Sequence, residues 1–370
     1  MTKFGYNVMS VPDRARLYDH ARKLQPPAML FYSHMGGTAQ EFAASFPNTA
    51  VILRSWPDGT DVLMEAPDKW LDRVSKGVPS NIYLYTCNEV GWSPALINWH
   101  IQVMKLAIQR KRRLCILNMG VGQPGPDSWK DAKELVTLAS QHRELFILSL
   151  HEYAGGVITS GLIGGDPKFI QPETWPAASQ AKALTRWHCG RLKFLVDQCR
   201  EWGIPAPRVV ITEAGFDFTG DIGTWLNKLR FTPPNKSING WKTLVDQWRD
   251  WWPMWSAEEA YGKQMLWAQD ALWSDAEAVL LFGWGDSGGW GAYDVSAAGV
   301  LQSMLETAPA PVVVPPVVTS PTPTPTPVPV PTPVPPPQPP APVKPYARIV
   351  SLLRQLADEF ESLDNAADAA

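Results

Sequence analysis

Two glutamates follow apolar, strand-like segments of this chain, and a pair of carboxyl groups can perform acid–base and nucleophilic chemistry. Glu89 lies in LYTCNEVGW (84–92) directly after Asn88, and Glu213 lies in VVITEAG (209–215). A carboxyl group that stays protonated can donate to a departing oxygen, while one that stays ionised can attack a carbon atom. An apolar strand that ends on a charge suggests that this end faces a cleft rather than a core.

The reaction that most directly needs such a pair is the hydrolysis of a glycosidic bond. Carboxyl groups about 5 to 5.5 Å apart suit double displacement with retention of the anomeric configuration. A wider separation leaves room for a water molecule and gives inversion. The function therefore depends on which elements carry the two acids and how far apart those elements hold them.

The first 306 residues alternate between apolar, β-branched-rich segments and amphipathic segments with helical period, such as 99–110 and 128–141. Near-continuous hydrophobic strands that alternate with helices indicate a parallel sheet covered on both faces. Eight units predict a (β/α)8 TIM barrel over 1–306. The alternative is an open doubly wound sheet, but no glycine-rich nucleotide-binding loop follows any strand. The expected strands are 4–9, 29–33, 50–54, 82–87, 114–118, 145–151, 209–213 and 279–284.

Active sites of such barrels form at the carboxyl ends of the strands. Within the sixth strand, His151 and Tyr153 share a face and are expected in the mouth of the barrel, whereas Glu152 points the other way and is expected to be a supporting or salt-bridged group. The polar and aromatic residues at successive strand ends are Arg54, Asn88, Glu89, Asn118, His151, Tyr153, Glu213 and Trp284.

This set resembles clan A glycoside hydrolases, which are retaining (β/α)8 enzymes, and within that clan it resembles family 5. The resemblance covers about residues 3–305 and rests on Asn-Glu after strand four, His-x-Tyr after strand six and Glu at the end of strand seven. Arg54 near strand three and Trp284 at strand eight complete it. It implies a glycosidase that needs no cofactor and no metal.

The resemblance also implies a role for each residue. Glu89 would be the general acid/base and Glu213 the nucleophile, and Asn88 would bind the sugar 2-hydroxyl. The supporting residues would be Arg54 and Tyr153, which hydrogen-bond Glu213, His151, which lines the site near Glu89, and Trp284, which forms the stacking floor under the sugar.

One active-site histidine of family 5 has no match here, because Tyr83 and Tyr85 occupy the region before Asn-Glu. His34, at the end of the second strand, is a candidate to supply an imidazole from another direction. Aromatic side chains that follow strand ends and could bind sugar rings are Trp56, Trp92 and Trp290.

Composition excludes several other classes of function. The net charge of −3 and the pI near 6.1 give no electrostatic footprint for nucleic acid or for an anionic membrane. The basic run 109–113 lies at the end of an expected helix, where cations suit the helix dipole. The four cysteines form no CxxC pair, so a metal site is not expected; Cys87 and Cys115 are expected to be buried free thiols.

The composition changes sharply after residue 306. Residues 307–345 form a proline-rich segment, with 18 prolines among the 37 residues 309–345, which predicts a stiff polyproline II spacer. In 346–370, Ile349, Leu353, Leu356, Phe360 and Leu363 recur at spacings of 4, 3, 4 and 3, as in a heptad seam. We expect a homo-oligomerisation helix, which the molar mass in solution would test; the alternative is an amphipathic helix that docks on another surface.

The sequence thus predicts a retaining glycoside hydrolase that cleaves β-glycosidic bonds in a polysaccharide or oligosaccharide. One alternative is a non-catalytic carbohydrate-binding or virion/surface structural protein on the same scaffold, and another is an enzyme that cleaves peptidoglycan. The sequence has no signal peptide and no transmembrane segment, so the expected location is cytoplasmic or released and particle-associated.

Overall fold

The computed structural model describes residues 2–55, 58–154, 189–218, 238–251, 253–287 and 289–308. The chain divides into two compact units, 1–313 and 314–370, and all described residues belong to the first. The C-terminal heptad segment and nearly all of the proline-rich segment lie outside the described residues, so their predicted roles stay predictions from the sequence. Most of the long segments that follow Tyr153 and Phe218 also lie outside the described residues.

Eight parallel strands close into a barrel, as the sequence predicts. Each strand pairs with the next one along the chain, and the last, β9, pairs with both β1 and β7. A short strand, β8 (Ile238–Asn239), pairs antiparallel with the end of β7. The barrel strands are β1 Phe4–Val8, β2 Ala28–Tyr32, β3 Ala50–Arg54, β4 Tyr83–Tyr85, β5 Arg113–Met119, β6 Phe146–Ala154, β7 Val209–Phe218 and β9 Ala278–Trp284.

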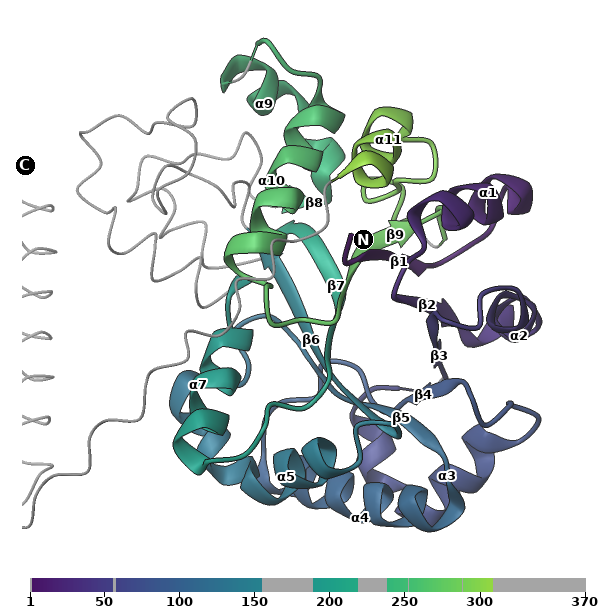
Figure 1. Cartoon of the computed structure of the whole chain (residues 1–370), viewed down its shortest axis with the longest axis vertical. Helices are drawn as coiled ribbons and strands as arrows, with labels where there is room; N and C mark the ends of the chain where they lie inside the picture. The colour runs from purple at the N-terminus through teal and green to yellow at the C-terminus, as the bar shows by residue number, and fades with distance from the viewer. Residues whose placement is uncertain are drawn as a thin grey trace, which may run out of the picture. The chain divides into compact units, whose positions relative to one another are not determined.

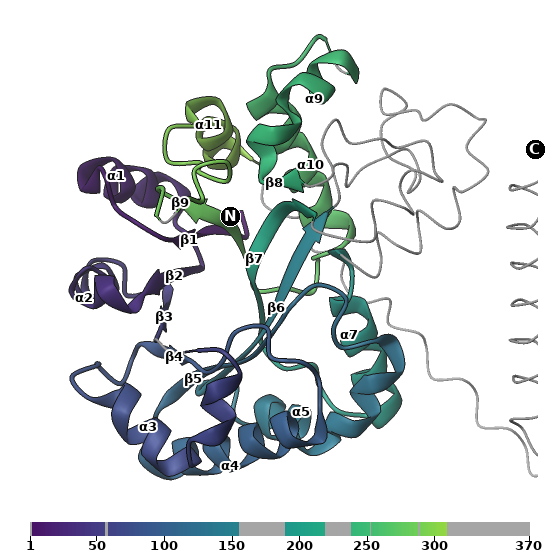
Figure 2. The same ribbon diagram turned by 180° about the vertical axis from the view of Figure 1, so that it is seen from behind.

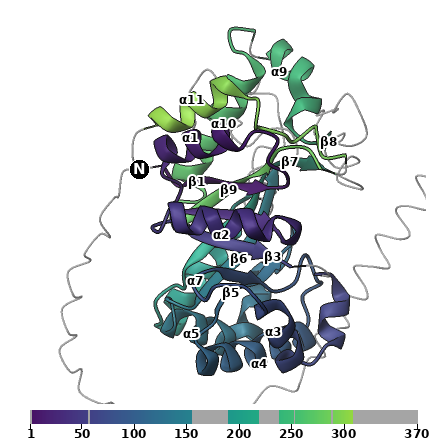
Figure 3. The same cartoon turned by 90° about the vertical axis from the view of Figure 1, so that its right-hand side faces the viewer.

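A ring of helices surrounds the barrel in chain order, from α1 through α5 and α7 to α10 and α11 (Figure 1). Figures 2 and 3 show the same ring from behind and from the side. Short 3-10 helices include η1 Ser33–Met35, η2 Thr60–Met64, η3 Pro126–Ala132 and η6 Trp241–Leu244. The α-helices are α1 Arg14–Leu24, α2 Gly36–Ser45, α3 Pro67–Ser75, α4 Pro94–Arg110, α5 Lys133–Gln141, α7 Leu192–Trp202, α9 Val245–Trp251, α10 Ala257–Ala271 and α11 Gly299–Thr307.

The strands are apolar on both faces because each face is buried in a different core. Leu30, Ile52 and Leu280 pack with Tyr85 inside the barrel. Their chain neighbours pack outward against the helices, for example Phe31 and Leu281. Full burial of one such side chain contributes about 1.5–3 kcal/mol, so both faces stabilise the ring and hold its carboxyl ends together.

A bulge near the end of β5 positions the chain that carries Glu89. Leu117 and Asn118 have positive φ values of 71° and 46°, and the β5–β6 register shifts between Ile116 and Met119. The Asn118 side chain donates to the Cys87 carbonyl at 2.8 Å, and its own carbonyl accepts from Glu89 N at 3.0 Å. The bulge therefore fixes the backbone on both sides of Asn88, which lies between these two contacts.

His100 on α4 supports the bulge from outside the barrel. Its Nε2 accepts from Leu117 N at 3.1 Å and from Thr86 Oγ1 at 2.9 Å, and its Nδ1–H donates to Leu96 O at 2.9 Å. The ring is fully buried, and burial disfavours its charged form. The pKa of His100 is therefore lowered to about 4.

The free energy of unfolding is expected to fall by about 3 kcal/mol through His100 alone as the pH drops from about 6.5 to 4. The unfolded chain binds a proton at His100 in this range and the folded chain does not. The contribution of His100 to the free energy of unfolding is therefore fully present above about pH 6.5 and is lost as the pH falls. Urea unfolding at a series of pH values would measure the slope. His100→Gln should flatten it, and an unchanged slope in this variant would contradict the assignment.

The four cysteines are buried free thiols, as expected for Cys87 and Cys115. None of the helices in the described part of the chain has the length and apolar character that a membrane crossing requires.

Candidate active site

The two carboxyl groups singled out in the sequence meet at the carboxyl end of the barrel. One oxygen of Glu89 and one oxygen of Glu213 lie within 4.8 Å of each other. The Glu213 side chain is 8% exposed and the Glu89 side chain 47% exposed. Two carboxyl groups in such different surroundings can take different protonation states, as acid and nucleophile require.

Both oxygens of Glu213 accept hydrogen bonds. Arg54 Nη1 donates to Oε1 at 2.9 Å, and the Tyr153 hydroxyl donates to Oε2 at 2.8 Å. The guanidinium is itself held by Asp58 at 2.5 Å and by the Tyr32 hydroxyl at 3.0 Å. A cation and a hydroxyl that donate to a buried carboxylate favour its ionised form.

Glu89 has a different set of neighbours. Its Oε1 lies 2.8 Å from His151 Nδ1, which is also 3.5 Å from Glu213 Oε2. Gly120 directly follows β5, and a Cβ atom there would lie 3.3 Å from the Glu89 carboxyl carbon. The Glu89 side chain therefore packs closely against the backbone of this glycine. The His151 hydrogen bond lowers the pKa of Glu89, and burial opposes this shift.

Asn88 and His151 share a partner that the sequence did not single out. The Tyr85 hydroxyl donates to Asn88 Oδ1 at 2.8 Å and lies 2.9 Å from His151 Nε2. Strand β4 and the loop after it therefore supply Tyr85, Asn88 and Glu89 within five residues, and β6 supplies the histidine that contacts Tyr85 and Glu89.

Glu152 lies on the opposite face of β6, as the strand period predicts. It accepts from Trp273 Nε1 at 2.7 Å and from Leu192 N at 3.2 Å, and Arg191 lies close enough to oppose the effect of burial. Burial raises the pKa of Glu152. This glutamate supports the outer layer and does not enter the mouth.

The prediction that Trp284 forms a stacking floor in the site is wrong. Its indole is buried on the outer face, 4.9 Å from the Tyr6 ring and stacked 5.6 Å from the His20 ring. The β1–β9 register shifts here, from Asn7 opposite Phe282 to Val8 opposite Trp284. This irregularity breaks the two-residue alternation and turns Trp284 away from the mouth.

Phe282 takes the inward position instead, with its ring 6.0 Å from Tyr153 and 5.1 Å from Tyr293. Trp290 packs against Phe282 at 5.6 Å and is 45% exposed. Trp290 is therefore a partly exposed aromatic side chain that packs on Phe282, and Phe282 in turn contacts Tyr153, which hydrogen-bonds Glu213.

Two of the other predicted candidates contact neighbouring residues of the barrel. Trp92 is half-buried against the edge of Trp129, at 5.4 Å. His34 donates from Nε2 to the Met9 carbonyl at 3.2 Å. Trp56 lies outside the described residues.

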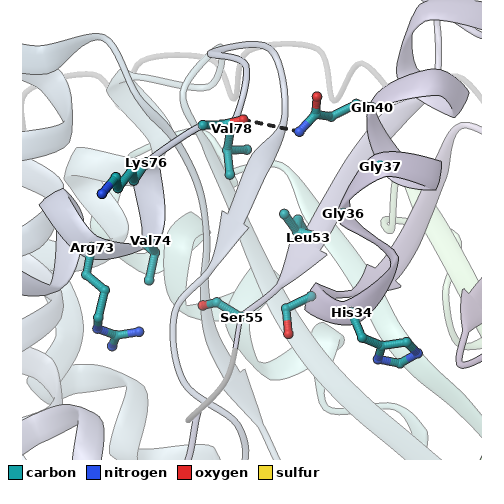
Figure 4. A pocket seen from close by; sticks show the side chains of 12 residues that line it. His34, Gly36, Gly37, Gln40, Leu53, Ser55, Arg73, Val74, Lys76 and Val78 are labelled. Carbon is teal, nitrogen blue, oxygen red and sulfur yellow. Dashed lines mark hydrogen bonds between the residues drawn. The ribbon is translucent and has the colours of Figure 1, made fainter.

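His34 also lines a cavity of about 460 Å³ between α2 and α3, beside β3 (Figure 4). Leu53, Val74 and Val78 contribute apolar surface, and Arg73 and Lys76 lie at its side. The residues that line this cavity include neither carboxyl group of the pair.

Arg191, which directly precedes α7, was not predicted as a site residue. Its guanidinium is fully buried and donates to the carbonyls of Gly120, Gln123 and His151. These contacts join the ends of β5 and β6 beside Glu89. Asp58 and Tyr32 were also missed, although both lie close to predicted strand ends.

Glu89, His151 and Glu213 each offer an atom that could bind a metal ion, all within 4.8 Å of one another. Ligand atoms on a tetrahedral zinc ion lie about 3.4 Å apart, whereas His151 Nδ1 and Glu89 Oε1 are 2.8 Å apart, which is a hydrogen-bond distance. Arg54 and Tyr153 already bind both oxygens of Glu213. The described geometry therefore favours two carboxyl groups that are each hydrogen-bonded to neighbouring side chains over a metal site.

No protein-family model matches the sequence, and a comparison with curated proteins gives no significant match. Solved structures with a similar fold include a GH128 (subgroup I) endo-β-1,3-glucanase from Amycolatopsis mediterranei in complex with laminaritriose. It is 12% identical with a TM-score of 0.42, and the match covers 82% of this chain and 100% of that chain.

Two other similar structures belong to larger chains. A β-glucuronidase from Ruminococcus gnavus in complex with D-glucuronic acid is 12% identical with a TM-score of 0.45, over 82% of this chain and 49% of that chain. A GH39 enzyme from Xanthomonas axonopodis pv. citri is 12% identical with a TM-score of 0.36, over 76% of this chain and 58% of that chain. These similarities concern the barrel fold and do not identify an activity.

Proposed function

We propose that this chain is a retaining glycoside hydrolase, a divergent relative of clan A, that cleaves β-glycosidic bonds in a polysaccharide or oligosaccharide. The observation that carries the proposal is the approach of Glu89 and Glu213, with an oxygen of each within 4.8 Å. This separation fits the carboxyl spacing of about 5–5.5 Å that double displacement uses, and it is narrower than the spacing that inverting enzymes need for a water molecule.

In the first step, Glu213 attacks the anomeric carbon while Glu89 donates its proton to the departing glycosidic oxygen. The carbon–oxygen bond to the leaving group breaks, and an ester bond between the sugar and Glu213 forms. In the second step, Glu89 takes a proton from a water molecule, which attacks the anomeric carbon and releases Glu213. The two inversions give net retention.

The neighbours of each carboxyl group suit these roles. Arg54 and Tyr153 donate to Glu213 and stabilise its ionised form, which is the attacking form. Asn88 projects from the same loop as Glu89, where a hydrogen bond to the sugar 2-hydroxyl can strengthen in the transition state. The exposed face of Trp290 offers a surface on which a sugar ring can stack.

The test of the proposed function is a screen of polysaccharides and aryl glycosides with wild type and Glu213→Gln side by side. Released sugar from wild type alone supports a hydrolase. Binding of a glycan by both proteins, with no sugar released by either, would support the non-catalytic carbohydrate-binding alternative. Turnover that disappears on treatment with a metal chelator would contradict a mechanism that depends on the two carboxyl groups alone.

For any glycoside that wild type cleaves, the first product is expected to keep the β configuration. Proton NMR spectra recorded early in the reaction would show the β-anomer before mutarotation produces the α-anomer. The α-anomer as first product would indicate single displacement, and it would contradict the assignment of Glu213 as a nucleophile.

A further inference from the structure

Tyr85 lies between the partners of both carboxyl groups. Its side chain is fully buried in the interior of the barrel, and its ring faces the Arg54 guanidinium at 5.4 Å. The hydroxyl reaches Asn88 Oδ1 at 2.8 Å and His151 Nε2 at 2.9 Å. One side chain thus contacts the cation that binds Glu213, the amide beside Glu89 and the imidazole that binds Glu89.

The single proton of this hydroxyl determines how its neighbours are arranged. Tyr85 donates it to Asn88 Oδ1, which turns the NH2 group of that amide away from Tyr85. The hydroxyl oxygen is then an acceptor, so the group that faces it from His151 is Nε2–H. With one proton on Nε2, the second proton of the pair lies between Nδ1 and Glu89 Oε1, which are 2.8 Å apart.

We propose that Tyr85 is a positioning residue for the reaction. Its hydroxyl orients the Asn88 amide and selects the His151 tautomer in which Nδ1 and Glu89 share the proton that the leaving group receives. The proposal rests on the proposed function and deepens it, because a retaining enzyme must present Glu89 protonated in the first step and ionised in the second. Burial raises the pKa of Tyr85 far above its usual range, so the hydroxyl keeps its proton.

The charged and titratable groups around the His151–Glu89 pair come from five other positions and stay in place when only the hydroxyl is removed. They are Glu213 on β7, Arg54 on β3, Tyr32 on β2, Tyr153 on β6 and Arg191 before α7. A change in the protonation of the pair in a Tyr85 variant can therefore be assigned to the lost hydroxyl.

The variant that tests the proposal is Tyr85→Phe, which keeps the ring over Arg54 and removes only the hydroxyl. Protonation of the pair would then leave Nε2–H buried without an acceptor. We expect kcat/KM to fall about 10- to 100-fold, and the basic limb of its pH profile to move down by about one pH unit. A uniform decrease with an unmoved limb would indicate a merely structural role and would overturn the proposal.

Tyr83→Phe is the matched control, because it removes a buried hydroxyl from the same strand. That hydroxyl accepts from Arg208 at 2.5 Å and donates to Glu144 O at 3.4 Å, and both partners lie outside the candidate site. The basic limb in this variant should coincide with that of wild type. Near-UV circular dichroism and urea unfolding would establish that both variants keep the fold.

A readout without turnover separates this inference from the proposed function. Nitrogen-15 NMR of labelled histidine, assigned by comparison with His151→Gln, reports which ring nitrogen carries the proton. Across a series of pH values, we expect Nε2–H to persist in wild type at a pH where Tyr85→Phe has already changed to Nδ1–H, which donates to the Glu89 carboxylate. The same tautomer in both proteins would overturn the role of Tyr85, whether or not a glycoside is cleaved. The expected switch in a protein that cleaves no glycoside would leave the tautomer assignment standing and would contradict only the proposed function.

Discussion

Replacing Glu213 with glutamine is expected to lower kcat on an activated aryl glycoside by about 10⁴- to 10⁶-fold, the range found when a nucleophile is removed. The amide has nearly the same shape as the carboxylate, but it carries no charge and cannot form the ester bond. Arg54 and Tyr153 both donate to Glu213. In the variant one of them would face an NH2 group, so some loss of stability accompanies the loss of activity.

The measurement is single-turnover and steady-state release of the aryl alcohol, with Glu134→Gln as control. Glu134 lies on α5 with a 59% exposed side chain and pairs with Lys105 on the surface, so this change should leave kcat intact. Urea unfolding of Glu213→Gln would establish that the barrel is folded. A folded variant with more than about 1% of wild-type kcat would refute the nucleophile assignment.

The sequence predicts the barrel because the signal for its strands is local. Each strand is an apolar run that is buried on both faces, such as Ala50–Arg54, and all eight appear where the pattern places them. Residues at strand ends follow from the same rule, because the carboxyl ends of parallel strands in a barrel lie at one rim. Glu89, His151 and Glu213 could therefore be brought together without any knowledge of their contacts.

The errors and omissions arise where the contacts are not local. Trp284 was assigned to the mouth because it ends the eighth strand and resembles the tryptophan of family 5 there, but the register shift against Val8 turns it away from the mouth. Tyr85 reads as one more apolar residue of a buried strand until the packing shows that its hydroxyl meets Asn88 and His151. Arg191 lies far along the chain from the predicted strand ends, so nothing in the sequence places it beside the end of β6.

The two acids share one rim of the barrel but have different surroundings, which is what the proposed mechanism requires. Glu213 is enclosed and receives two donors, one of them the Arg54 cation, and these contacts hold both of its oxygens in place for the proposed attack. Glu89 is half exposed, and its main partner is an imidazole that can either donate or accept a proton. A group that must give a proton in one step and take one in the next needs such a partner, whereas a nucleophile does not.

Glu89→Ala is expected to have an effect that depends on the leaving group. With a poor leaving group, such as another sugar, the departing oxygen needs the proton, and kcat/KM should fall about 10²- to 10⁴-fold. With a dinitrophenyl glycoside the first step needs no acid, so kcat/KM should change little while kcat falls at the second step. Azide ions that enter the vacated space should restore kcat and give a β-glycosyl azide.

The pH profile gives an independent test of the same residue. The His151 hydrogen bond lowers the pKa of Glu89. Since the acid must be protonated, kcat/KM on a poor leaving group should decrease as the pH rises through that pKa, and wild type should have an acidic optimum. Glu89→Ala has no proton to lose, so its profile should lack this basic limb. A limb that persists in the variant would assign the acid to another group, because neither Asn88 nor the ionised Glu213 can supply that proton.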